Sequence, residues 1–322
     1  MLRIALSKTK GLLPKNIITM KDFSFVSISQ LFSFASQLEK SNPSEYSDLL
    51  SKKIVALLFY QPSTRTYMNF HTAALKLGAH VIGFSDPKTT RAGDFYKESL
   101  EDVVRFTEPL CNLLVLRHFE NFAAQRAASN IRLPLINAGD GYNEHPTQAL
   151  GDVWTMNLEL GGLEGKTIGL LGDLSVRSLK AIVMTLSKFP IKELLFLLPE
   201  DKEIPEVLLN IMKESNTNWR VVSDVETLMI YSDLIETIGI NHPNHNLSID
   251  SVNEISPISE KYLINAQLIK KTKPSIPILH PGPRTNEISG DVDSLPNAAY
   301  FRQIRNGLFI RMALLACLAG DM

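Results

Sequence analysis

The chain has few cysteines, no long apolar run and no excess of charge of either sign. Only two cysteines, Cys111 and Cys317, occur among its 322 residues, and both lie in apolar stretches, which predicts buried free thiols and a reducing compartment. No run reaches the length of about 20 apolar residues that a membrane-spanning helix needs. The first residues, Met1 to Lys8, lack the apolar region and cleavage pattern of a signal peptide. We therefore expect a cytoplasmic protein that does not enter membranes.

The charge and the histidines exclude further classes of protein. The formal net charge is −1 and the pI is 6.7, so nothing indicates binding to nucleic acid or to an anionic membrane surface. Several histidines share no metal-ligand spacing with acidic or cysteine partners, namely His71, His80, His242 and His245. We therefore predict neither a bound metal nor a cofactor.

The length of the chain suggests two domains, each large enough for its own core. Short apolar runs, typical of buried strands, alternate with segments whose apolar residues recur at helical spacing. This alternation favours an α/β fold with two domains, each a parallel sheet flanked by helices. We place the boundary near residue 150, which gives domains of residues 1–150 and 151–296, followed by a C-terminal helix within 297–322. The expected strands are residues 53–60, 81–84, 113–116, 133–136, 167–171, 193–198, 220–222, 232–235 and 277–279, and the expected helices are 22–41, 66–77, 99–108, 122–128, one from 146, 178–189, 205–214 and 302–318.

The segment Gln61–Thr66, between an apolar run and a helix-like stretch, is the most informative. A helix N-terminus offers unpaired N–H groups and a partial positive charge. Ser63, Thr64 and Thr66 would add hydroxyl donors and Arg65 a planar charged fork, a combination that suits a phosphate. The alternative is an ordinary Ser/Thr helix cap beside a solvated arginine.

Two later segments also carry polar residues where an apolar run ends. In residues 137–150, His145 stands just before a helix and Gln148 follows three residues later, so both can face one ligand. In residues 278–284, an apolar stretch ends in a Pro/Gly turn. Ligands of open α/β sheets bind beyond the carboxyl ends of the strands, so we expect these segments to converge in a cleft between the two domains. A dinucleotide-binding enzyme is the rival interpretation, but the G-x-G-x-x-G fingerprint is absent.

Five segments follow one another in an informative order. They are Ser63–Thr66, Arg117-His118, His145–Gln148, Gly172–Leu174 with Arg177, and His280–Arg284. In these segments, and from about Leu13 to its C-terminus, the chain resembles the aspartate carbamoyltransferase catalytic chains of the aspartate/ornithine carbamoyltransferase family. The resemblance implies transfer of the carbamoyl group of carbamoyl phosphate to the amine of an amino acid, foremost L-aspartate, giving N-carbamoyl-L-aspartate and phosphate for pyrimidine biosynthesis. It further implies that the first domain binds carbamoyl phosphate, that the second binds the acceptor, and that the C-terminal helix packs back on the first.

The resemblance also implies roles for individual residues. Arg65, Thr66, Arg117 and His145 would be catalytic: His145 donates a hydrogen bond to the carbonyl oxygen with help from Thr66 and Arg117, and Arg65 stabilises charge on the bridging oxygen. The residues implied to bind carbamoyl phosphate are Ser63, Thr64, Arg65, Thr66, Arg117, His145, Gln148 and, through their backbone carbonyls, Pro281 and Gly282.

Arg177 matches the arginine that binds a carboxylate of the acceptor. Structural interpretations stay open beside these roles. Arg177 also fits a helix-start arginine in a surface salt bridge, Arg117 a strand-end surface charge, and His280 a packed turn residue. Asp173 fits a loop-ordering or capping group better than an acid or base.

Two segments depart from the family pattern. The loop 86–97, which in the family carries a Ser and a Lys that reach a neighbouring subunit's site, is one residue longer and has Tyr96 at the lysine position, with Lys97 next to it. Farther on, Gly239 stands where the family has a second carboxylate-binding arginine, and Asn241 where it has a glutamine. The candidate acceptor-binding residues are Arg177, Lys97, Arg284 and Asn241, with Arg91 as a further source of compensating charge.

Three hypotheses follow from these departures. The first is aspartate carbamoyl transfer with a remodelled acceptor pocket, the second is transfer to a different amine in a specialised pathway, and the third is a non-catalytic homologue. If Glu236 faced the cleft, it would repel a second carboxylate of the acceptor, or would instead attract a cation of the acceptor. The shared loop implies a homotrimer with a shared active site, and whether regulatory chains bind stays open.

Overall fold

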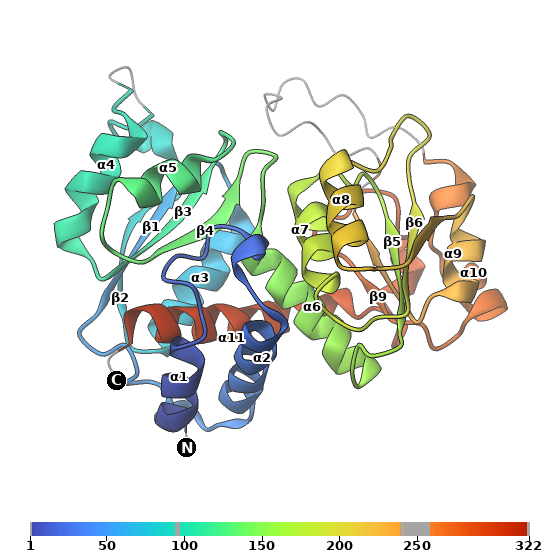
Figure 1. Cartoon of the computed structure of the whole chain (residues 1–322), viewed down its shortest axis with the longest axis horizontal. Helices are drawn as coiled ribbons and strands as arrows, with labels where there is room; N and C mark the ends of the chain where they lie inside the picture. Colours follow the sequence, from blue (N-terminus) through green and yellow to red (C-terminus); the bar gives the residue numbers. More distant parts are fainter. Residues whose placement is uncertain (1, 94–96, 239, 241–257, 321–322) are drawn as a thin grey trace. The chain divides into compact units, whose positions relative to one another are not determined.

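The chain folds into two compact units, each built on its own parallel sheet (Figure 1). The structure is a computed structural model that describes residues 2–93, 97–238, 240 and 258–320. Unit 1 comprises residues 1–151 and 307–322, and unit 2 comprises residues 152–306. The predicted fold class, parallel sheets flanked by helices, is confirmed.

Unit 1 is built around a four-stranded sheet with the order β2-β1-β3-β4. Its strands are β1 (Ile54–Phe59), β2 (His80–Phe84), β3 (Leu113–His118) and β4 (Leu135–Asp140). Its helices are α1 (Leu2–Lys10), α2 (Phe25–Lys40), α3 (Thr64–Lys76), α4 (Leu100–Thr107) and α5 (Ala123–Ser129). Alternate residues of β1 and β3 pack with α4 and α5 into one buried apolar cluster, while α3 lies across the other side of the sheet (Figure 1). Burial on both faces explains why these strands appear in the sequence as continuous apolar runs.

Unit 2 repeats this plan with a five-stranded parallel sheet of order β7-β6-β5-β8-β9. Its strands are β5 (Thr167–Leu171), β6 (Glu193–Leu197), β7 (Trp219–Val221), β8 (Leu234–Thr237) and β9 (Ile278–Leu279). Its helices are α7 (Arg177–Leu186), α8 (Glu206–Glu214), α9 (Val225–Tyr231) and α10 (Ala266–Thr272). Helices α9 and α10 contribute to a buried apolar cluster of this unit, and α7 and α8 lie on the other side of the sheet (Figure 1).

Two long helices, α6 (Pro146–Leu160) and α11 (Tyr300–Ala319), each contribute residues to both units. A Cβ added at Gly151 would lie 3.3 Å from the Cα of Gly307. The absence of side chains at these two positions therefore allows α6 and α11 to pass at close range inside unit 1.

Most predicted elements are present, with bounds that differ by a few residues. Three helices were not predicted: α1, α9 and α10. Strand β8 begins and ends two residues later than predicted, so that Glu236 and Thr237 belong to the buried strand. This shift changes how Glu236 must be interpreted.

Candidate active site

The Ser63–Thr66 segment lies where β1 leads into α3, as its sequence predicts. Ser63 is the N-cap of the helix, and its side-chain oxygen accepts a hydrogen bond from the Thr66 N–H at 3.4 Å. The capping interpretation is therefore right for Ser63, and the next two residues, Thr64 and Arg65, are exposed. Thr66 is buried. The result is a thirteen-residue helix whose N-terminal N–H groups lie beside an exposed arginine, an arrangement that attracts anions.

Arg117 lies at the carboxyl end of β3, directly beside the end of β1. Phe59 and Arg117 are register partners, and the Tyr60 N–H donates to the Arg117 carbonyl oxygen at 2.8 Å. The Arg117 Nη1 donates to the Ala138 carbonyl oxygen at 3.1 Å, and the residue is 8% exposed. The surface-charge interpretation of Arg117 is therefore wrong.

The order of the strands makes the ends of β1 and β3 a natural binding position. From β1 the chain moves outward to β2 and then returns to β3 on the other side of β1. Ligands of open α/β sheets bind at such a switch point, beyond the carboxyl ends of the strands. The Ser63–Thr66 segment follows one of these strands and Arg117 is the penultimate residue of the other, so both lie at the switch point of unit 1.

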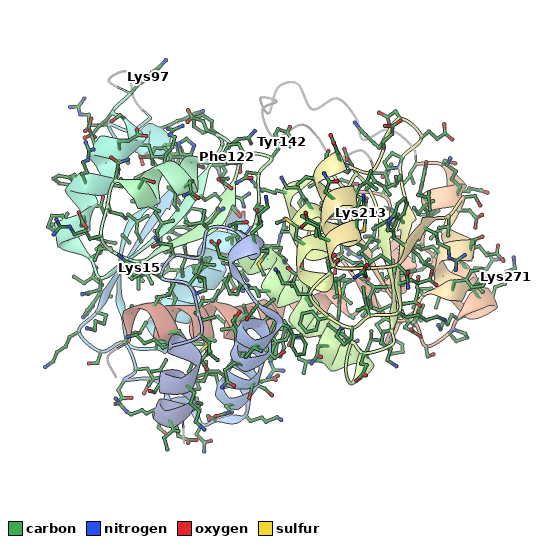
Figure 2. All side chains as sticks on the ribbon, viewed as in Figure 1. Lys15, Lys97, Phe122, Tyr142, Lys213 and Lys271 are labelled. Carbon is green, nitrogen blue, oxygen red and sulfur yellow. The ribbon has the colours of Figure 1, made fainter. Side chains whose placement is uncertain are left out.

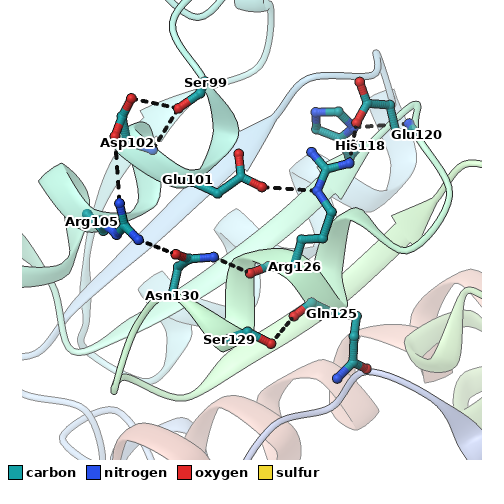
Figure 3. A network of polar contacts seen from close by, with 10 residues as sticks. All are labelled: Ser99, Glu101, Asp102, Arg105, His118, Glu120, Gln125, Arg126, Ser129 and Asn130. Carbon is teal, nitrogen blue, oxygen red and sulfur yellow. Dashed lines mark hydrogen bonds and ion pairs between the residues drawn. The ribbon is translucent and has the colours of Figure 1, made fainter.

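A polar network supports the loop that follows Arg117 (Figure 3). The Glu120 N–H donates to His118 Nδ1 at 3.0 Å, and Arg126 contacts Glu120 at 2.7 Å and Glu101 at 3.0 Å. Burial lowers the pKa of His118 to about 4, so its imidazole is neutral at physiological pH. Arg126 thereby links α4 and α5 to the end of β3.

His145 lies at the turn into α6 and is buried. Its carbonyl oxygen accepts hydrogen bonds from the N–H groups of Gln148 and Ala149, at 3.1 Å and 3.2 Å, which starts the helix. Upstream, the Asn137 Nδ2 donates to Asp140 Oδ1 at 2.9 Å, and the Gly139 N–H donates to Asn137 Oδ1 at 2.8 Å. These bonds order the buried end of β4, and the Glu144 N–H donates to Asp140 Oδ1 at 3.3 Å, which ties the residue before His145 to that strand end.

Gln148 contacts a residue that sequence reasoning missed. Arg311, on the C-terminal helix α11, donates from Nη2 to Gln148 Oε1 at 3.4 Å and from Nη1 to Asn69 Oδ1 at 3.2 Å. Its guanidinium also lies over the Phe70 ring, 5.3 Å from the ring centroid. A single arginine inside the apolar stretch 309–319 was the available signal.

In unit 2, Gly172 and Arg177 follow β5, which lies at the switch point of that sheet. Gly172 has φ +135°, and an added Cβ would lie 2.3 Å from Ile238 Cγ2, so the turn requires glycine. Asp173 accepts a hydrogen bond from the Ser175 N–H at 2.8 Å, which agrees with a loop-ordering role. Arg177 is the first residue of α7 and is 4% exposed. The surface salt-bridge interpretation of Arg177 is therefore wrong.

The His280–Arg284 segment forms a tight turn after β9. The side chain of His280 is fully buried, with Nε2 2.6 Å from Glu287 Oε1 and Nδ1 accepting from the Gly282 N–H at 2.7 Å. The structural interpretation of His280, a packed turn residue, is therefore confirmed. Pro281 and Gly282 are half-buried, and the Gly282–Pro283 peptide bond is cis.

Three candidate acceptor-binding residues have different surroundings. Arg284 forms a two-pronged ion pair with Asp293, one bond measuring 2.9 Å, and its guanidinium lies over the Tyr300 ring. Its charge is therefore already paired, and its acceptor role stays a prediction. Lys97 is exposed on unit 1 (Figure 2). Asn241, like Gly239, lies outside the described residues.

Glu236 faces neither a carboxylate nor a cation of an acceptor, the two possibilities that its sequence position suggested. It is fully buried in β8, and both of its carboxyl oxygens lie near the Gln303 Nε2, at 3.1 Å and 3.4 Å. A carboxyl group buried in this way is not presented to an acceptor.

Two further features concern metal binding and membranes. Within residues 2–93, 97–238, 240 and 258–320, no group of three or more His, Cys, Asp or Glu side chains is arranged to hold a metal ion. In the same part of the chain, no helix combines the length and apolar character needed to cross a membrane.

Comparison with known proteins accounts for nearly the whole chain. The family model for the carbamoyl-P binding domain of aspartate/ornithine carbamoyltransferase matches residues 15–158, and that for the Asp/Orn binding domain matches residues 164–318. The chloroplastic aspartate carbamoyltransferase of Arabidopsis thaliana is 37% identical over 94% of this chain and 77% of that protein. The aspartate carbamoyltransferase catalytic subunit of Thermoplasma volcanium is 35% identical over 95% of this chain and 99% of that protein.

Solved structures agree with this assignment. The crystal structure of aspartate transcarbamoylase from Trypanosoma cruzi in complex with aspartate and phosphate matches with a TM-score of 0.86 and 30% identity, covering 97% of both chains. The same enzyme in complex with N-(phosphonacetyl)-L-aspartic acid matches with a TM-score of 0.85. The chain therefore belongs to the aspartate/ornithine carbamoyltransferase family.

Proposed function

We propose that the chain transfers the carbamoyl group of carbamoyl phosphate to the amine of L-aspartate, giving N-carbamoyl-L-aspartate and phosphate for pyrimidine synthesis. Unit 1 binds carbamoyl phosphate and unit 2 binds the acceptor. The observation that carries the proposal is the register of Phe59 and Arg117, which puts the Arg117 end of β3 beside the strand that leads into the Ser63-capped helix.

The main contribution of unit 1 to the proposed reaction is the stabilisation of negative charge. A dianionic phosphate suits the N-terminal N–H groups of α3, the exposed Arg65 and the hydroxyl of Thr64. As the amine attacks, negative charge builds on the carbonyl oxygen, where His145, Thr66 and Arg117 supply hydrogen-bond donors. Phosphate then leaves, with Arg65 and Arg117 stabilising its charge.

The carbamoyl NH2 group needs acceptors and orientation rather than charge. Gln148 offers its side-chain oxygen, and the turn at Pro281 and Gly282 offers backbone carbonyls. Arg311 restrains Gln148, which supports a positioning function for this arginine on α11.

The acceptor half rests on Arg177, which starts α7 at the carboxyl end of β5. Its guanidinium binds one carboxylate of aspartate. A second candidate function, carbamoyl transfer to a different amine, is favoured by one observation: Gly239 occupies the position at which the resemblance calls for a second carboxylate-binding arginine. A non-catalytic role is disfavoured because the chain keeps every residue proposed for carbamoyl phosphate.

The test is product formation from carbamoyl phosphate by the purified protein. Aspartate is assayed first, then a panel of amino acids and amines, with release of phosphate and formation of the ureido product measured together. Rapid formation of carbamoyl-aspartate supports the proposal. Turnover with another amine but not with aspartate moves the function to the second candidate, and no turnover with any acceptor contradicts both.

The family likeness also favours a homotrimer with a shared active site, in the cytoplasm. Lys97 is then a contributor to a neighbouring subunit's site. Light scattering tests the assembly, because a trimer has three times the mass of the 35.9 kDa chain.

A further inference from the structure

Two carboxyl groups of unit 2 lie buried around one amide. Asp152 on α6 and Glu236 on β8 are both fully buried. The Gln303 Nε2, on α11, lies 2.5 Å from Asp152 Oδ1 and 3.1 Å from Glu236 Oε1. An amide NH2 group has two N–H donors, so it can donate one hydrogen bond to each carboxyl group.

The other end of the Gln303 amide holds the turn after β9. Its Oε1 accepts a hydrogen bond from the His280 N–H at 2.8 Å. The His280 side chain in turn contacts Glu287 and accepts from the Gly282 N–H at 2.7 Å. A continuous chain of buried hydrogen bonds therefore runs from Glu236 through Gln303 to the backbone of the His280–Gly282 turn.

The surroundings of Glu236 determine its charge. On the two neighbouring strands its register partners are Leu170 and Leu279, which are apolar. The ionisable group that faces it is Asp152 on α6, while His280 and Glu287 lie at the far end of the Gln303 amide. Burial, followed by the charge of Asp152, raises the pKa of Glu236 well above its ordinary value. Its surroundings therefore favour the neutral, protonated form of Glu236 over the carboxylate.

We propose that Glu236 is a positioning residue: together with Asp152 it orients Gln303, and Gln303 sets the backbone of the His280–Gly282 turn. Its effect on catalysis rests on the proposed function, because that turn is the one assigned to the carbamoyl NH2 group. A loose turn lowers the fraction of bound substrate held in a reactive geometry.

Two substitutions separate positioning from simple loss of structure. Glu236→Gln keeps the shape, the neutral charge and an oxygen that accepts from Gln303. Glu236→Ala removes the acceptor and leaves space beside the amide. We expect kcat/KM for carbamoyl-aspartate formation to fall on the order of 10- to 100-fold in Glu236→Ala, and to return to within about twofold of the wild type in Glu236→Gln. Equal loss in both variants, or no loss in Glu236→Ala, would overturn the proposal.

The pH profile gives a second measurement that a merely space-filling side chain would not change. In the wild type, Glu236 ionises as the pH rises and then repels Asp152, so activity declines on the alkaline side. Glu236→Gln has no such group, so its alkaline decline is expected to move to higher pH or to disappear. An unchanged alkaline limb in this variant contradicts the proposal, even if Glu236→Ala does not fold.

Hydrogen exchange separates this proposal from the proposed function. The His280 N–H is itself the donor to Gln303, so its exchange reports the bond without any substrate. We expect the peptide 278–284 to exchange on the order of tenfold faster in Glu236→Ala and at the wild-type rate in Glu236→Gln, with the β1 peptide 54–59 unchanged in both. If the protein shows this exchange pattern but no carbamoyl transfer, only the proposed function is contradicted. Unchanged exchange in Glu236→Ala contradicts the positioning role.

Discussion

The carboxylate of Glu144 accepts a hydrogen bond from the Met20 backbone N–H at 2.8 Å, although the two residues are 124 positions apart. Its other oxygen accepts from the Thr19 hydroxyl at 2.5 Å. Glu144 immediately precedes His145 in the turn that begins α6. The N-terminal segment is thus attached directly to the turn that carries the proposed oxyanion donor.

The first prediction concerns this attachment. Glu144→Ala removes the acceptor of the Met20 N–H and the Thr19 hydroxyl. We therefore expect the free energy of unfolding to fall by roughly 1–3 kcal/mol. Because the His145 turn loosens, kcat should fall about tenfold or more. Glu144→Gln, which keeps one acceptor oxygen, should lose less on both measures. Wild-type kcat in a folded Glu144→Ala variant would show that the attachment does not position His145.

A second prediction addresses the phosphate site. Arg65→Ala should lower kcat/KM about 100-fold or more, because it removes a charge-assisted donor that acts on the leaving phosphate. Arg65→Lys should be intermediate, since an ammonium group lacks the planar fork of the guanidinium. The control is Arg132→Ala, at an exposed position of unit 1. Near-normal turnover in Arg65→Ala would remove the basis of the site assignment.

The third prediction is a pH dependence of stability. Burial alone would raise the pKa of Glu287, but the hydrogen bonds from His280 and Thr285 and the charge of His280 together outweigh it and lower the pKa to about 2 from its ordinary 4.5. A lowered folded-state pKa means that the ionised group stabilises the fold fully above pH 4.5 and loses this effect as the pH falls toward 2. We expect the free energy of unfolding, from urea titrations, to fall over this window by up to about 3 kcal/mol. Glu287→Gln should flatten that part of the curve while lowering stability at pH 7.

The fourth prediction compares two glycines of unit 2. At Gly172, φ is +135° and an added Cβ would lie 2.3 Å from Ile238 Cγ2, whereas at Gly290 an added Cβ meets nothing within 4 Å. Gly172→Ala should therefore destabilise the protein by roughly 2–4 kcal/mol and reduce activity, because it disturbs the loop before Arg177. Gly290→Ala should change thermal stability little. Equal melting temperatures for the two variants would contradict the steric argument.

Local sequence signals were sufficient for the strands and for most of the helices. The buried strands appear as apolar runs because helices cover both faces of each sheet. Helix α1 buries Leu2, Ala5 and Leu6 at helical spacing, but nine residues give a weak periodic signal. Helices α9 and α10 have only seven residues each, and tertiary packing stabilises such short helices more than their own propensity does.

The motif residues were found because they follow predicted strands, but their partners were not. The predicted strand 232–235 stops short of Glu236, and an isolated ionisable side chain is costly to bury. Gln303, 67 positions later, supplies the hydrogen bonds that make its burial possible. Arg311 likewise contacts Gln148 across 163 positions. Such partners are set by the tertiary fold and leave no periodic pattern in the sequence.

The discontinuous make-up of unit 1 has a consequence for protein synthesis. Residues 307–322 belong to unit 1 but are translated after the whole of unit 2. The contiguous unit 2 is therefore synthesised in full before the last segment of unit 1. Unit 1 therefore begins to emerge first but completes its fold only after unit 2 has been made, and its surface that receives residues 307–322 stays uncovered until those residues emerge.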